Sequence, residues 1–142
     1  MSDASSAPTH DWNGDSGDRW AANLARLDLM LQDFGDAAVA SADAKAGEHI
    51  LDIGCGSGTS SFALARCVEP EGHVLGVDIS EQLVVIARAA TPAGAPVEFR
   101  PADAATAPLP AGRFDLVARY YLPHEEIISG AWKLPPVELA TR

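Results

Sequence analysis

LDIGCGSGT, residues 51–59, carries the strongest structural signal in this chain. It places Gly54, Gly56 and Gly58 between an apolar run typical of a buried parallel strand and a stretch typical of a helix. Glycines suit such a junction because the chain turns sharply there and because a side chain would keep a ligand away from the backbone. The spacing therefore predicts a loop that binds a nucleotide-like cofactor.

Outward from this loop, strand-like runs alternate with helical ones. Ser80 is a good N-cap for the second of these helices. Such alternation predicts an α/β fold, a Rossmann-like parallel sheet with helices on both faces, of which only about four strands are recognisable. The expected strands are residues 49–54, 73–79, 97–103 and 113–121, and the helices between them are residues 59–68 and 81–90.

The N-terminal part of the chain has a different pattern. Leu24, Leu27, Leu31 and Phe34 recur at helical spacing, and Gly35 is expected to end that helix before an Ala-rich second one over residues 36–46. The predicted organisation is a disordered tail at residues 1–10, a helical cap at 11–46, a cofactor-binding half-domain at 47–121, and an irregular tail at 122–142.

The choice of cofactor depends on the details of the loop. Its spacing is G-x-G-x-G, with Thr59 where the dinucleotide motif has its third glycine, and Asp52 lies two residues before the first glycine. A carboxylate suits a ligand that carries an ammonium group and disfavours a pyrophosphate. The loop therefore favours S-adenosylmethionine over NAD.

Two further acids follow the next strands. Asp78 ends the second strand, where a carboxylate can accept hydrogen bonds from both ribose hydroxyls. Asp103 ends the third strand, beside the small residues Ala104 and Ala105, and could accept a hydrogen bond from an adenine amino group. The alternative is that these acids are helix N-caps or surface carboxylates. If the sheet is parallel, all three acids share its carboxyl edge.

Together, LDIGCGSGT, GVDIS, the Asp103-Ala104 pair and FDLVARYYLPH resemble class I, Rossmann-like S-adenosylmethionine-dependent methyltransferases, closest to their bacterial small-molecule branch, over residues 11–124. The resemblance implies S-adenosyl-L-methionine as cofactor and a small-molecule acceptor. The implied cofactor-binding residues are Asp52, Gly54, Cys55, Gly56 and Gly58 for the methionine part, Asp78 for the ribose, and Ile79, Asp103 and Ala104 for the adenine.

Methyl transfer from a sulfonium is an in-line displacement, so the protein mainly positions the acceptor and excludes water. No catalytic residue is assigned, although His124 lies just past the fourth strand and could act as a base. The resemblance makes Trp12 and Trp20 candidate lid residues over the cofactor. The alternative is that both tryptophans simply pack the cap helix.

Composition limits the other function classes. With 20 acidic and 10 basic residues the formal charge is −10, which argues against a nucleic-acid binder and against a polybasic membrane-surface protein. We find no apolar run of the roughly 20 residues that a membrane span needs, and no signal peptide, so we expect a cytoplasmic protein. Cys55 and Cys67 show no metal-ligand spacing, and no metal site is expected.

The strand–helix alternation stops after Tyr121, and residues 122–142 depart from the family pattern. The sequence therefore suggests a C-terminally truncated methyltransferase. Its fourth strand then exposes an edge that could promote self-association, unless the tail folds back and covers that strand. Two alternatives remain. One is a non-catalytic fragment that only binds the cofactor or self-associates, and the other is a NAD-dependent oxidoreductase.

Overall fold

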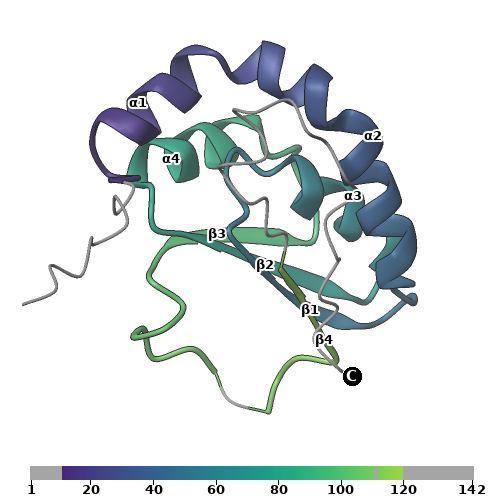
Figure 1. Cartoon of the computed structure of the whole chain (residues 1–142). Coiled ribbons are helices and arrows are strands. Elements are labelled where there is room, and N and C mark those ends of the chain that lie inside the picture. Colours follow the sequence, from purple (N-terminus) through teal and green to yellow (C-terminus); the bar gives the residue numbers. More distant parts are fainter. Residues whose placement is uncertain (1–10, 111, 120–142) are drawn as a thin grey trace, which may run out of the picture.

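A computed structural model of the chain describes residues 11–110 and 112–119, and Figure 1 shows its central parallel sheet. The strand order is β3-β2-β1-β4, which confirms the predicted Rossmann-like α/β fold. The strands are β1 (His49–Ile53), β2 (His73–Asp78), β3 (Val97–Pro101) and β4 (Leu116–Arg119), and the helices are α1 (Asp15–Ala22), α2 (Leu24–Ala42), α3 (Thr59–Val68) and α4 (Glu81–Ala90).

The strand order reverses direction at β1. From β1 the chain moves to β2 and β3 on one side, and it then returns to place β4 on the other side of β1. Open α/β sheets bind their ligands outside the carboxyl ends of the strands at such a switch point. The glycine-rich loop follows β1 directly, so the fold brings it to that position.

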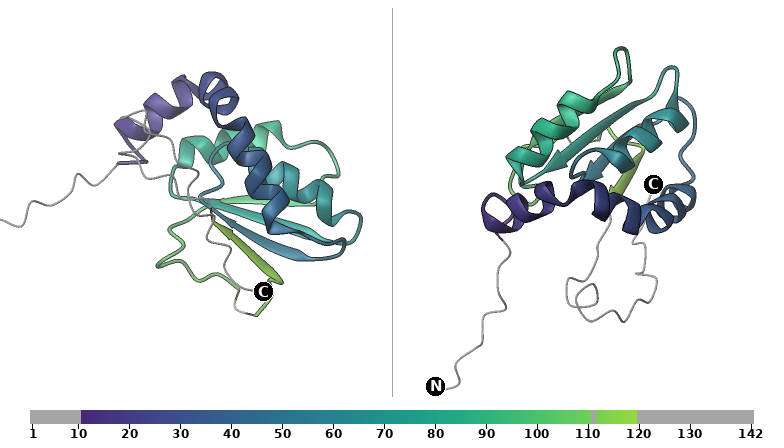
Figure 2. Two further views of the ribbon diagram at one scale, coloured as in Figure 1. Left: turned by 45° about the vertical axis from the view of Figure 1, so that its right-hand side comes forward. Right: turned by 90° about the horizontal axis from the view of Figure 1, so that it is seen from above.

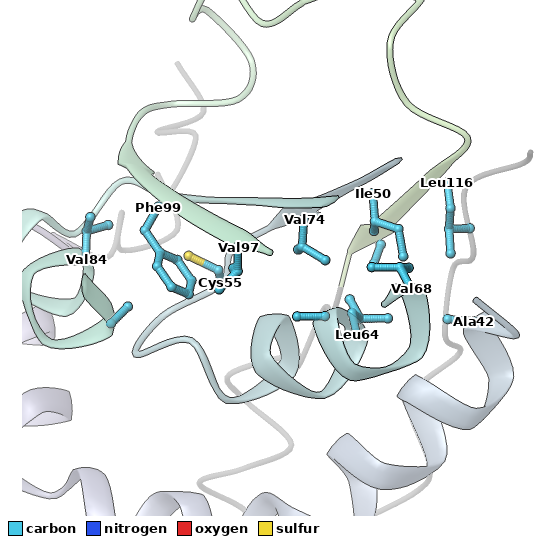
Figure 3. Close-up of a cluster of buried hydrophobic side chains, with 13 residues drawn as sticks. Ala42, Ile50, Cys55, Leu64, Val68, Val74, Val84, Val97, Phe99 and Leu116 are labelled. Carbon is cyan, nitrogen blue, oxygen red and sulfur yellow. The ribbon is translucent and has the colours of Figure 1, made fainter. Parts of the chain in front are cut away.

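Helices α3 and α4 cover one face of the sheet, as Figure 2 shows. The connections from β1 to β2 and from β2 to β3 run in the same direction along the sheet, and such crossovers share one hand as a rule, so their helices lie on the same face. Their apolar residues, among them Leu64, Val68 and Val84, pack against strand residues such as Ile50 and Val74 in a fully buried cluster (Figure 3). The boundaries predicted for these two helices, 59–68 and 81–90, are confirmed.

The covering of the opposite face of the sheet differs from the prediction, which was helices on both faces. Among the described residues, this face is covered by the connection from β3 to β4, residues 102–110 and 112–115, which forms no helix (Figure 2). Leu109 and Phe114 of this connection pack against Leu51, Leu75 and Val77. The connection contains two prolines, Pro108 and Pro110, whose missing N–H groups disfavour a helix interior.

The N-terminal cap is a pair of helices in which α1 packs on α4 and α2 packs on α3. The prediction that Gly35 ends a helix is wrong, because α2 continues through Gly35 to Ala42. A glycine inside a helix costs only about 1 kcal/mol, and the half-buried face of Leu24, Leu27 and Leu31 continues past it into buried Ala38 and Ala42. The expected tails at residues 1–10 and 122–142 lie outside the described residues, as does His124.

Candidate functional site

The candidate site lies where β1, β2 and β3 end beside one another. The parallel register pairs Ile53 with Val77 and Asp78 with Pro101, so the residues that follow each strand reach the same edge. The backbone N–H of Ala102 donates to the carbonyl oxygen of Asp78 at 2.9 Å, which continues the pairing one residue beyond β3. The loop after β1, Asp78 and Asp103 therefore meet at the edge that the sequence predicts.

The glycine loop is fastened to the end of β2. The N–H groups of Gly54 and Cys55 both donate to the carbonyl oxygen of Val77, at 2.8 and 3.1 Å. Gly54, Gly56 and Gly58 have φ angles of +74°, +54° and +95°, a region that other L-residues rarely adopt. The turn between β1 and α3 therefore depends on glycine at all three positions.

The three glycines differ in what surrounds them. A Cβ on Gly58 would lie 2.8 Å from Cζ of Phe99 and 3.0 Å from Cε2 of Phe62, so this glycine lets α3 pack closely on the sheet. A Cβ on Gly54 or on Gly56 would meet nothing within 4 Å. The first two glycines therefore border open space that a ligand could occupy close to the backbone.

Asp78 joins the loop to the start of α4. One of its carboxylate oxygens accepts from the N–H of Gly56 and the other from the N–H of Ser80, both at 2.8 Å. A carboxylate oxygen has two lone pairs, so each can still accept a hydroxyl proton from a ligand. Asp78 is half-buried, which leaves it accessible from the edge of the sheet.

Asp52 lies beneath the loop with 0% of its surface exposed. The hydroxyls of Ser61 and Ser60, in the first turn of α3, donate to its Oδ2 at 2.6 and 2.8 Å. Burial raises the pKa of Asp52 from 3.8 to about 6; the two serine hydrogen bonds lower this pKa, and the charge of Asp78 raises it. The other oxygen of Asp52, Oδ1, is buried and has no hydrogen-bond partner among the described residues.

This arrangement favours a cationic ligand group. Two carboxylates, Asp52 and Asp78, lie close enough for the charge of one to raise the pKa of the other. A positive charge beside the loop would stabilise ionised Asp52, whereas a phosphate there would be repelled by both acids. The ammonium and sulfonium of S-adenosylmethionine therefore fit the chemistry of this site, and the open space at Gly54 and Gly56 gives such a ligand room.

The residues expected at the adenine lie at the same edge, and their surroundings differ. Ile79 directly follows Asp78 and is 44% exposed. Its apolar side chain is therefore available to contact a flat ring. Asp103 is exposed, and its Oδ1 accepts from the N–H of Ala105 at 2.9 Å, so it also serves as a turn cap. Ala104 packs against the apolar cluster that includes Leu51 and Val77.

Cys55 does not present its side chain to this edge. Its side chain is buried in the core near Phe99 and Val84 (Figure 3), and its N–H is already bonded to Val77. Burial raises the pKa of the Cys55 thiol, and the charges of Asp52 and Asp78 raise it further. The thiol of Cys55 therefore packs in the core, and its assignment as a cofactor-binding residue stays a prediction.

Sequence reasoning missed the residues that hold Asp52 in place. Ser60 and Ser61 were identified only as part of a helix, yet both donate to the buried carboxylate. Gly76, paired with Asp52 across the sheet, leaves space for them, since its Cβ would lie 2.9 Å from the Ser61 hydroxyl oxygen. Adjacent hydroxyl residues in the first helical turn after the loop are the signal that could have revealed this support.

The cap helix α1 is held at the start of α4, next to the candidate site. The side-chain oxygen of Asn13 accepts from the N–H of Glu81 at 3.0 Å, and the Gln82 amide donates to Asp18. Trp12 and Trp20 pack edge to face on this cap, with ring centroids 5.8 Å apart. This packing agrees with the alternative that the two tryptophans simply pack the cap helix. Their role as a lid over the cofactor stays a prediction.

Two negative findings apply to residues 11–110 and 112–119. They contain no group of three or more His, Cys, Asp or Glu side chains that could hold a metal ion. They also contain no helix that is long and apolar enough to cross a membrane.

Comparisons with known proteins agree with this geometry. The model of the family described as "Methyltransferase domain" matches residues 50–130. Nocamycin O-methyltransferase from Saccharothrix syringae is 42% identical over 77 residues, which is 53% of this chain and 28% of that protein. Demethylmenaquinone methyltransferase from Symbiobacterium thermophilum is 38% identical over 80 residues, 54% of this chain and 32% of that protein.

A solved structure has the same fold. The S-adenosylmethionine-dependent methyltransferase from Mesorhizobium loti matches with a TM-score of 0.50 and 33% identity, over 59% of this chain and 37% of that one. The chain thus spans about a third of the length of the relatives that it matches.

Proposed function

Because this chain belongs to the methyltransferase-domain family, we propose that it binds S-adenosylmethionine and transfers the methyl group to a small-molecule acceptor. The observation that carries the proposal is the buried Asp52 carboxylate, with one oxygen unpaired among the described residues, beneath a glycine loop that Asp78 holds in place. These two acids make the site suited to a cation-bearing cofactor.

The sulfonium of the bound cofactor supplies an activated methyl group that an acceptor can attack in line. The residues of this chain have the task of binding and orienting. Gly54 and Gly56 let the ligand approach the backbone, Asp52 attracts its positive charge, and Asp78 accepts from its ribose hydroxyls. Ile79 offers its exposed side chain to the adenine ring, and Asp103 offers its carboxylate to the adenine amino group.

The oxidoreductase alternative is disfavoured by the same charges. NAD would place its pyrophosphate at the loop after β1, close to Asp52 and Asp78, and the repulsion would be strong because Asp52 is fully buried. The non-catalytic alternative predicts cofactor binding without turnover. An acceptor of low molecular weight is supported by the names of two relatives, which refer to nocamycin and to demethylmenaquinone.

A turnover assay tests the proposal. The 142-residue chain would be incubated with S-adenosylmethionine and a panel of phenols, enols and amines, and S-adenosylhomocysteine would be measured by mass spectrometry. We expect acceptor-dependent product that Asp78→Asn reduces and that Asp33→Asn, an exposed acid on α2, does not. Binding of S-adenosylmethionine without product from any acceptor would favour the non-catalytic alternative.

A further inference from the structure

An open pocket of about 320 Å³ is lined by residues of the two cap helices and by Trp12. We call it the α1–α2 pocket; its lining includes Trp12, Arg19, Trp20, Arg26, Leu27 and Met30. Its volume is at the lower end of the range found for small-molecule sites, which begins at roughly 300 Å³. A ligand of one or two fused rings would fit such a space.

Two arginines give the α1–α2 pocket its charge. The ion pairs among the described residues join Lys45 to Asp43 and Arg100 to Glu98, so neither Arg19 nor Arg26 is paired with a described carboxylate. The chain as a whole is strongly acidic, with a formal charge of −10. Two guanidinium groups on one small cavity therefore create a local site for an anion, and guanidinium binds carboxylate with matched geometry.

The rest of the lining is aromatic and apolar. Trp12 and Trp20 are half-buried and lie at 75° to one another, and Leu27 and Met30 continue the apolar surface on α2. Tryptophan rings bind flat aromatic groups by stacking or by edge contact. The lining thus combines an aromatic surface with two cations, which is complementary to an aromatic ring that carries an anionic oxygen group.

The cap that carries the α1–α2 pocket is attached beside the candidate cofactor site. Asn13, just before α1, and Asp18 of α1 hydrogen-bond to Glu81 and Gln82 in the first turn of α4, which begins three residues after Asp78. We propose that the α1–α2 pocket binds the methyl acceptor, and that this acceptor is an aromatic carboxylate. The acceptor assignment rests on the function proposed above, whereas the ligand class rests on the pocket alone.

The test is a calorimetric titration of the full 142-residue chain with 2-naphthoate and with the neutral analogue 2-naphthamide. We expect naphthoate to bind about tenfold or more tightly than naphthamide, since hydrogen bonds between a guanidinium and a carboxylate are stronger than those to a neutral amide. The double variant Arg19→Gln/Arg26→Gln should lose about this factor for naphthoate and little for naphthamide. Arg66→Gln, an exposed arginine on α3 without a described ion pair, should leave both affinities unchanged.

Further arms separate this inference from the proposed function. Trp20→Leu should weaken both probes alike, because it removes the aromatic surface and no charge. S-adenosylhomocysteine would be titrated in parallel. If it binds while the two probes bind equally well or not at all, the inference about the α1–α2 pocket is overturned and the proposed function is not. Naphthoate binding as expected without any S-adenosylhomocysteine binding overturns the proposed function and supports the ligand class. Competition between naphthoate and S-adenosylhomocysteine overturns the acceptor assignment, since both must bind together.

Discussion

Replacing Asp52 by Asn tests the electrostatic basis of the site. The folded-state pKa of Asp52 is about 6, against 3.8 for the free side chain. One pKa unit corresponds to about 1.4 kcal/mol, so ionised Asp52 destabilises the folded chain by about 3 kcal/mol at neutral pH. Because the folded-state value is the higher one, this cost is absent below the unfolded-state pKa and grows as pH rises toward the folded-state pKa.

The variant should lose this pH dependence. An Asn amide oxygen can still accept from Ser60 and Ser61, while its NH₂ group would occupy the position of Oδ1, which has no described partner. A buried donor without a partner costs about 1–3 kcal/mol, and this cost does not depend on pH. The free energy of unfolding of the parent minus that of Asp52→Asn should therefore fall by about 2 kcal/mol between pH 4 and pH 7.

Urea unfolding, followed by circular dichroism at both pH values, measures this difference. Asp33→Asn is the matched control, because Asp33 is an exposed acid on α2 and its variant should follow the parent at both pH values. If the stability difference between parent and Asp52→Asn is the same at pH 4 and pH 7, the assignment of a buried, ionising Asp52 is wrong.

Three further outcomes are expected. Gly56→Ala should weaken S-adenosylhomocysteine binding about tenfold in calorimetry, because φ there is +54° and the new methyl enters the open space by the loop; unchanged affinity would contradict the loop's role. Gly58→Ala should lower the free energy of unfolding in urea by about 2–4 kcal/mol, since its Cβ would lie 2.8 Å from Phe99 at a φ of +95°. Iodoacetamide should label exposed Cys67 in the native chain and buried Cys55 only after unfolding, as peptide mass spectrometry would show; rapid labelling of Cys55 would contradict its burial.

Much of the fold was predictable because local signals agree with the tertiary structure. Helix α4 begins after Ser80, whose hydroxyl accepts from the N–H of Leu83, and α3 begins after the left-handed Gly58. Gly35 shows the opposite case. Its local preference favours a helix end, but burial of the α2 face on α3 outweighs a penalty of about 1 kcal/mol.

The parts of the candidate site that depend on backbone position were predictable from the motif. The parts that depend on side-chain packing were less predictable. Asp52 and Asp78 were found from their places relative to the glycine loop, and the structure brings them together. The inward side chain of Cys55 and the support of Asp52 by Ser61 depend on how α3 packs against the sheet, which the spacing of the motif does not encode. The helix-free connection after β3 is likewise a consequence of its prolines, which the expectation of helices on both faces, drawn from the strand–helix alternation, overlooked.

The most direct test of the central claim is calorimetric titration of the 142-residue chain with S-adenosylhomocysteine, with NADH as the competing ligand class. We predict saturable binding of S-adenosylhomocysteine, about tenfold or more weaker in Asp78→Asn and unchanged in Asp33→Asn, and no binding of NADH. The absence of S-adenosylhomocysteine binding in a chain that still melts cooperatively would contradict the assignment of this site.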